Sequence, residues 1–517
     1  NVSNQFAVST GLETPVSCST SSPYLANLTH TGSYCHFFSC NVWQPLGENH
    51  DTFDPLNLES SYHPFDRRKW CNHMNRRPNP SIFNWLATLL IAVLALTGCS
   101  DGSDGKGHNS PPPEALVSLA QDVSRANGGR AAILHVTTAE GKTWEVAAGL
   151  ADANAEREAK SSDIVEIGSV SKVFLAATVL RLVERGLLGL DDPVSQWINL
   201  ADLDALTGGN GALIRLRHLL NHSTGMGDYL NFSDDDNVVL ETYGITGDTV
   251  FAPQELIDRT IDLTEQPVAG GKTFPVFTLQ DYKGESYPDY DALPISWYSN
   301  THYVMLGLIV EAVTGERYED IIRQEVIESL GLKDTSFGTD GVRADLRGYA
   351  LGLAASGENP VTMSPTLSWA AGQTLSTVAD LAIFVGALYK GELFDRAETL
   401  ELWKNQYFKP LQGEVPYGLG IMRFDLYGPE AGVFYGHDGQ VLGAVALMAY
   451  HVETGDVYTA AVNNSQYRSV DSGEGGSTWE LAPKLRQIAD ANRRLRHTGA
   501  GLNSGWRRYL VSLEAQL

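Results

Sequence analysis

The two ends of the globular part of the chain carry strand-like patterns. Residues 131–152 form two apolar runs that are interrupted by Glu140-Gly141, which predicts a β-hairpin. Residues 432–464 form further apolar and aromatic runs around a turn at Thr454-Gly455. We therefore expect β-strands near both ends of the folded region.

Helical patterns fill the region between these strands. An apolar stripe begins near Ser169 and ends at Gly186, further stripes cover residues 301–315 and 376–390, and residues 215–350 are mainly helical in pattern. The first stripe consists of Val173, Ala176, Ala177, Leu180 and Val183. Strands at both ends with helices between them predict an α/β (α+β) fold, in which one antiparallel sheet built from the two chain ends adjoins a mainly helical subdomain.

Composition excludes several classes of function. The 517 residues carry a formal charge of -25, which argues against a nucleic-acid partner because phosphate binding needs clustered Lys and Arg. None of the five cysteines lies after Cys99, so the later region has neither a disulfide nor a Cys/His metal cluster. We expect no metal and no cofactor.

A short uncharged apolar run, residues 85–97, has the pattern of a secretory signal. Two arginines precede it, it is too short to span a bilayer comfortably, and small residues follow it before Cys99. Its ending, LTGC, resembles the bacterial lipobox, which implies lipidation of Cys99 and anchoring to a membrane on the periplasmic side of the envelope. Ser100 favours the outer membrane. The alternative is a buried core helix.

This signal suggests how the chain is divided. The expected parts are an upstream segment (1–73), a signal peptide (74–98), a flexible tether (99–113), a globular domain (114–495) and a C-terminal tail (496–517). We interpret the upstream segment as sequence that does not belong to the mature protein, the alternative being a small disulfide module.

A candidate nucleophile lies at the start of the first helical stripe. Ser169 and Lys172 are three residues apart, so they share one face of the first turn, where free N–H groups favour negative charge. A serine hydroxyl becomes a good nucleophile only when a neighbouring base takes its proton, and a desolvated lysine amine can do this. The pair alone is weak, because a serine that caps a helix explains the same pattern.

Two further motifs occur in the order typical of one enzyme family. Tyr298-Ser299-Asn300 precedes a helix, and His437-Asp438-Gly439 lies on a late strand. With the Ser169-x-x-Lys172 motif, the chain resembles the penicillin-recognising serine hydrolases, the family of class C β-lactamases and serine DD-peptidases. Matching segments extend over about 116–488, which implies the DD-peptidase/β-lactamase-like fold.

The resemblance implies a role for each motif residue. Ser169 attacks a carbonyl and forms an acyl-enzyme, while Lys172 and Tyr298 share the proton transfers; which of the two is the base in acylation stays open. Asn300 hydrogen-bonds the amide side chain of the substrate. The backbone N–H groups of Ser169 and Gln440 form the oxyanion hole.

The third motif departs from that of the β-lactamases. His437 replaces the usual lysine, and with an ordinary histidine pKa it would bind a substrate carboxylate as an imidazolium, beside Gly439. Asp438 adds an unusual charge. The resemblance therefore implies a DD-peptidase-like (D-Ala-D-Ala carboxypeptidase) or esterase-like enzyme acting on a small molecule or a peptidoglycan peptide. The alternatives are a true β-lactamase and a non-catalytic envelope-binding lipoprotein.

Other motifs have simpler explanations. Gly271-Lys272-Thr273 lacks the first glycine of a phosphate loop, and Leu219 replaces the glutamate that a zinc-protease helix needs between His218 and His222, so we expect structural histidines there. Residues 267–294 are longer than the family's turn and interleave tyrosines with acids. They form either a solvated loop or a flap beside Tyr298.

Overall fold

The computed structural model describes residues 111–230, 249–265, 288–289, 291–292, 296–351, 359–405, 409–410, 415–425 and 427–498. All of them belong to the compact unit Gly102–Leu517. Cys99, the signal-like run and most of residues 267–294 lie outside the described residues. Within the described part, no helix combines the length and apolar character needed to cross a membrane.

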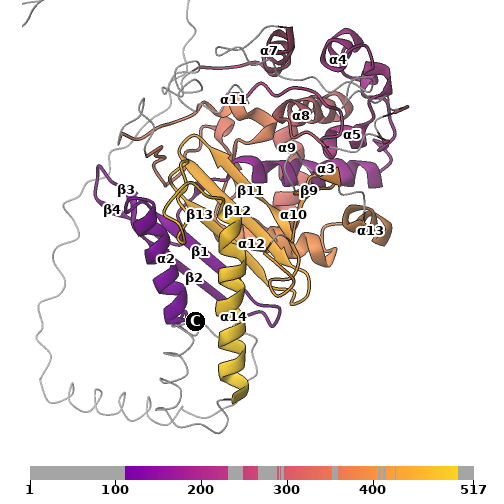
Figure 1. The fold of residues 1–517 in the computed structure, drawn as a ribbon. Helices are drawn as coiled ribbons and strands as arrows, with labels where there is room; N and C mark the ends of the chain where they lie inside the picture. Colours follow the sequence, from indigo (N-terminus) through magenta and orange to yellow (C-terminus); the bar gives the residue numbers. More distant parts are fainter. Residues whose placement is uncertain are drawn as a thin grey trace, which may run out of the picture. The chain divides into compact units, whose positions relative to one another are not determined.

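An eight-stranded antiparallel sheet forms the centre of the described unit (Figure 1). Its strands, in spatial order, are β2 (Thr143–Ala148), β1 (Ala132–Thr137), β13 (Val457–Val462), β12 (Ala444–His451), β11 (Phe434–Val441), β10 (Met422–Phe424), β9 (Pro416–Tyr417) and β8 (Lys409–Pro410). The early strand β1 pairs with the late strand β13, Leu134 lying opposite Ala460. The predicted sheet from both chain ends is therefore confirmed.

The two faces of this sheet carry different layers. Helices α2 (Glu114–Ala126) and α14 (Leu481–Thr498) cover one face, where alternate β1 residues such as Leu134 are buried. The intervening residue Ile133 points to the other face, which packs against α12 (Val378–Lys390) and the helical region. The period of two along the strands thus places apolar side chains in both cores.

The helical region adjoins the second face. Its helices are α3 (Ser171–Glu184), α4 (Leu200–Thr207), α5 (Leu216–Leu220), α7 (Pro253–Glu265), α8 (Asn300–Thr314), α9 (Tyr318–Ile322), α10 (Glu328–Leu330), α11 (Pro365–Ser368) and α13 (Ala397–Asn405). Two small sheets complete the fold: β3 (Leu150–Asp152) with β4 (Arg157–Glu158), and β5 (Val165–Glu166) with β7 (Thr374–Ser376) and β6 (Ser336–Phe337). The described part of 215–350 is mainly helical, as expected.

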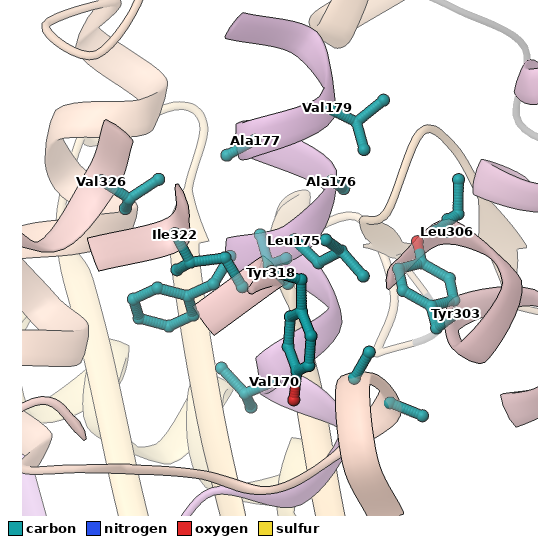
Figure 2. Packing of buried hydrophobic residues seen from close by; sticks show 14 of the residues in the cluster. Val170, Leu175, Ala176, Ala177, Val179, Tyr303, Leu306, Tyr318, Ile322 and Val326 are labelled. Carbon is teal, nitrogen blue, oxygen red and sulfur yellow. The ribbon is translucent and has the colours of Figure 1, made fainter. Parts of the chain in front are cut away.

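Helix α3 is buried on more sides than the single apolar stripe in its sequence predicts. Almost all of its residues are buried, and Val183, which we placed in the stripe, is only half-buried. Figure 2 shows its side chains among those of Tyr303 and Leu306 from α8 and Ile322 from α9. A helix packed on all sides gives the residues at its N-terminal end a rigid support, and Ser169 lies immediately before that end.

Candidate active site

Ser169 lies in a tight turn, and the helix starts later than predicted. A 3₁₀ turn, η1 (Gly168–Val170), joins β5 to α3, whose first residue is Ser171. Gly168 has a φ of +52°, a conformation that favours glycine. The turn places Ser169 at the N-terminal end of α3, where the free N–H groups of the helix lie.

Lys172 reaches back to Ser169 from inside the protein. Its side chain is 0% exposed, and Nζ lies 3.0 Å from Ser169 Oγ, 2.7 Å from Asn300 Oδ1 and 2.7 Å from the carbonyl oxygen of Ala371. Burial lowers the pKa of Lys172 to about 7, against the opposing effect of the Asp228 and Asp438 carboxylates. At neutral pH much of this amine is therefore unprotonated. It can donate to Asn300 and Ala371 while it accepts the Ser169 hydroxyl proton.

Tyr298 lies beside Lys172 and Ser169. Lys172 Nζ is 4.9 Å from the centroid of the Tyr298 ring. The Tyr298 hydroxyl is buried, and no described atom forms a hydrogen bond of ordinary geometry with it. Burial raises the pKa of Tyr298 well above its usual value, although an interaction with the Ser169 hydroxyl lowers it. Tyr298 is therefore a neutral phenol that can pass a proton, and Lys172 is the group whose pKa suits a base.

Asn300 links Lys172 to a carboxylate that the sequence did not indicate. Its Oδ1 accepts from Lys172, and its Nδ2 donates to Asp228 Oδ2 at 2.8 Å. Asp228 is 3% exposed, and its other oxygen accepts from the Leu230 N–H at 3.0 Å. The expected contact of Asn300 with substrate stays a prediction, since the structure shows this residue orienting the lysine.

Strand β11 approaches the nucleophile turn through a glycine. A Cβ on Gly439 would lie 1.9 Å from the carbonyl oxygen of Ile167 and 3.1 Å from Ser169 N. Across the same contact, a Cβ on Gly168 would lie 2.7 Å from Gln440 N. The backbone N–H groups of Ser169 and Gln440 therefore come from adjoining segments, and their role as an oxyanion hole stays a prediction.

The third motif holds a buried histidine, and its expected contact with a substrate carboxylate stays a prediction. His437 is 1% exposed, and burial lowers its pKa to about 3, so its imidazole is neutral at physiological pH. Its Nδ1 contacts the Asp438 carbonyl oxygen, which can only accept, so Nδ1 carries the proton. Its Nε2 then accepts from the Tyr417 hydroxyl at 3.0 Å. Both ring nitrogens are thus satisfied within the protein.

A pair of buried histidines, His222 and His302, lies beside Tyr298. The Nδ1 atoms of His222 and His302 lie 2.8 Å apart. Because His222 Nδ1 accepts a hydrogen bond from the Ser299 N–H, the proton between the two rings belongs to His302 Nδ1. His302 Nε2 in turn contacts Thr224 Oγ1 at 2.5 Å, and the His222 ring lies 4.4 Å from the Tyr298 ring. Burial lowers the pKa of both histidines. This neutral pair fixes the ring of Tyr298.

The two histidines at positions 218 and 222 do not form a metal site. His218 accepts from the Arg215 N–H and contacts Asp291, so the two histidines of the rejected metal motif serve different neighbours. Among the described residues, no group of three or more metal-ligating side chains gathers. Gly271-Lys272-Thr273 lies outside the described residues.

Known proteins share this sequence pattern. The family model described as Beta-lactamase matches residues 118–476. Penicillin-binding protein 4* of Bacillus subtilis is 24% identical over 325 residues, 59% of this chain and 62% of that protein. Esterase EstB of Burkholderia gladioli is 30% identical over 222 residues, 42% of this chain and 48% of the esterase. The chain thus spans between 48% and 62% of the length of these two relatives.

Solved structures share the fold. D-amino acid amidase from Ochrobactrum anthropi SV3, crystallised with L-phenylalanine amide, superposes with a TM-score of 0.58 at 25% identity, covering 73% of this chain and 98% of the amidase. An octameric penicillin-binding protein homologue from Pyrococcus abyssi gives a TM-score of 0.55 at 22% identity, over 73% of this chain and 76% of that one. The chain belongs to the beta-lactamase family, as a β-lactamase-related serine hydrolase, and this confirms the resemblance drawn from its three ordered motifs.

Proposed function

We propose that this protein hydrolyses amide or ester bonds of small substrates through an acyl-enzyme on Ser169. The observation that carries the proposal is the 3.0 Å contact between Ser169 Oγ and the fully buried Lys172 Nζ. A buried amine with a pKa near neutrality can act as a base toward the hydroxyl that it contacts.

The proposed reaction follows from this geometry. Lys172 accepts the Ser169 proton as Oγ bonds to the substrate carbonyl carbon, and the oxyanion accepts from the N–H groups of Ser169 and Gln440. Tyr298 donates its proton to the leaving amine or alcohol as the scissile bond breaks, and it regains one from Lys172. Water then attacks the acyl-enzyme, which releases the acid and returns a proton to Ser169.

Amidase-like or esterase-like activity fits the site better than β-lactamase activity or D-Ala-D-Ala carboxypeptidase activity. Substrates of the latter two enzymes carry a carboxylate, and His437 is buried, neutral and bonded to Tyr417. Two of the similar proteins are an esterase and a D-amino acid amidase. A penicillin-binding protein is also among the relatives, so DD-peptidase activity is the second candidate.

Intact-mass spectrometry with a panel of acyl donors tests the proposal. The panel contains short p-nitrophenyl esters, amino acid amides, a D-Ala-D-Ala peptide, nitrocefin and a fluorescent penicillin. We expect adducts of acyl mass on the peptide containing Ser169, with the fastest turnover for esters or amides. Rapid nitrocefin turnover would favour a β-lactamase instead, and no adduct from any donor would support a non-catalytic binding protein.

An envelope location is a separate part of the proposal. The LTGC ending at Cys99 supports lipidation, periplasmic placement and outer-membrane sorting. We expect that, after expression in a bacterium from Met74, the protein incorporates labelled palmitate and that Cys99→Ala abolishes this incorporation. Label that persists in Cys99→Ala would contradict the proposed anchor, and Ser100→Ala, which keeps the cysteine, is the matched control.

A further inference from the structure

Asp228 is a buried carboxylate that the proposed reaction does not yet use. It follows α5 and is 3% exposed, and both of its oxygens have partners. Oδ1 accepts from the Leu230 N–H at 3.0 Å, and Oδ2 accepts from Asn300 Nδ2 at 2.8 Å. Because a backbone N–H can only donate, the atom that faces Leu230 must be an acceptor. Any donor introduced at this position would therefore face Asn300.

The orientation of the Asn300 amide follows from Asp228. An ionised carboxylate only accepts hydrogen bonds, so it holds the amide nitrogen of Asn300 on its own side. The amide oxygen is then turned toward Lys172 Nζ, at 2.7 Å. A reversed amide would bring two acceptor oxygens together at Asp228, and the repulsion between them disfavours that arrangement.

This orientation decides where the lone pair of Lys172 points. A neutral amine has two N–H bonds and one lone pair. Asn300 Oδ1 and the Ala371 carbonyl oxygen, each 2.7 Å from Nζ, accept from the two N–H bonds. The lone pair is left for the Ser169 hydroxyl, at 3.0 Å. An amide nitrogen in the place of Oδ1 would donate to the amine and draw the lone pair away from the serine.

We propose that Asp228 is a positioning residue that, through the Asn300 amide, directs the lone pair of Lys172 toward the Ser169 hydroxyl. The inference rests on the proposed function and adds a residue on which its first proton transfer depends. The alternative is a purely structural role, in which Asp228 only stabilises the N-terminal end of α8, whose first residue is Asn300.

Asp228→Asn tests the inference, because it keeps the shape of the side chain and adds a donor. Its oxygen must face the Leu230 N–H, so its amide nitrogen faces Asn300 and should reverse the Asn300 amide. We would follow the burst of acylation by p-nitrophenyl acetate from roughly pH 5 to 9. The acylation rate constant should fall about ten- to a hundredfold, the cost of a misdirected catalytic group, while the half-saturating ester concentration stays within about twofold.

The pH dependence of acylation gives a second measurement. The Asp228 carboxylate raises the pKa of Lys172 against the larger effect of burial, so its loss should move the ascending limb to lower pH. Asp438, the other carboxylate that raises this pKa, is unchanged in the variant. Burial lowers the pKa of the neighbouring histidines and raises that of the neighbouring tyrosines, which keeps all of them neutral here: His222, His302, His437, Tyr298 and Tyr303. A purely structural loss would leave the limb in place.

A double variant exchanges the two side chains. In Asp228→Asn combined with Asn300→Asp, the amide at position 228 donates to a carboxylate at position 300, whose other oxygen again accepts from Lys172. Most of the acylation rate should return at high pH. The ascending limb should lie above its wild-type position, because a carboxylate in contact with the amine favours the protonated form.

Asp163→Asn is the matched control. Asp163 is 5% exposed and accepts from the Lys160 N–H at 3.0 Å and from Arg157, so the same chemical change should lower the unfolding temperature and keep acylation within about twofold. The inference is overturned if Asp228→Asn leaves the rate or the limb unmoved, if it mainly raises the half-saturating concentration, or if the double variant recovers nothing. If acyl-enzyme still forms on Ser169 in those cases, the hydrolase proposal stands.

Discussion

Ser169→Ala should abolish hydrolysis of every acyl donor, with a loss of about a millionfold in kcat. Losses of this scale follow when a serine that acts as a unit with its base is removed. Among the described residues, Ser169 Oγ is the hydroxyl that lies within hydrogen-bond distance, 3.0 Å, of Lys172 Nζ. Without this nucleophile no tetrahedral intermediate forms, so the adjacent N–H groups have no oxyanion to stabilise. Covalent labelling by a fluorophosphonate should disappear as well.

Ser171 supplies the matched control for this variant. It lies two residues later, is 3% exposed, and its Oγ accepts from the Thr374 N–H at 3.1 Å. Ser171→Ala should keep its labelling and lose about 1 kcal/mol of stability, the cost of one buried hydrogen bond. Ser169→Ala should unfold at nearly the wild-type temperature. Labelling that survives Ser169→Ala would place the nucleophile elsewhere.

The fold was predictable wherever a pattern repeats locally. The turns at Glu140-Gly141 and Thr454-Gly455 separate paired strands as expected, and both glycines adopt positive φ. Helix α3 was harder, because a core helix packed on all sides has no polar face from which its orientation can be inferred. The boundaries of the expected domains stay a prediction.

The site was predictable to the extent that its residues belong to short motifs. Ser169, Lys172 and Tyr298 lie together as the three ordered motifs suggested. Asp228 escaped notice because a single acid after glycines has no periodic signal. The carbonyl of Ala371 could not be found at all, since any residue type supplies that acceptor.

The protonation state of His437 could not be predicted from the sequence. A histidine in a strand motif was given its ordinary pKa, but the pKa depends on burial and on partners distant in sequence. Tyr417 lies 20 residues earlier, and only the pairing of β9 through β10 to β11 brings its hydroxyl to the ring. Sequence shows neither the partner nor the loss of solvent.

Lys172→Met should lower kcat/KM by about two to four orders of magnitude, the range for a lost proton-transfer partner. The wild-type pH profile should identify the lysine. Burial lowers the pKa of Lys172 to about 7, and the base must be unprotonated, so kcat/KM should fall about tenfold per unit below pH 7 and level off above it. Tyr298, whose pKa is raised well above 10, adds no descending limb near neutrality.

Two further variants decide whether Lys172 acts as a base or only as a charge. Lys172→Arg keeps the charge but cannot lose its proton, so it should be as inactive as Lys172→Met at every pH, with thermal unfolding confirming that both variants fold. Glu166, whose pKa burial raises to about 7, titrates in the same window, and Glu166→Gln should therefore retain the ascending limb. An active Lys172→Arg, or a limb that vanishes only in Glu166→Gln, would show that the lysine is not the base that activates Ser169.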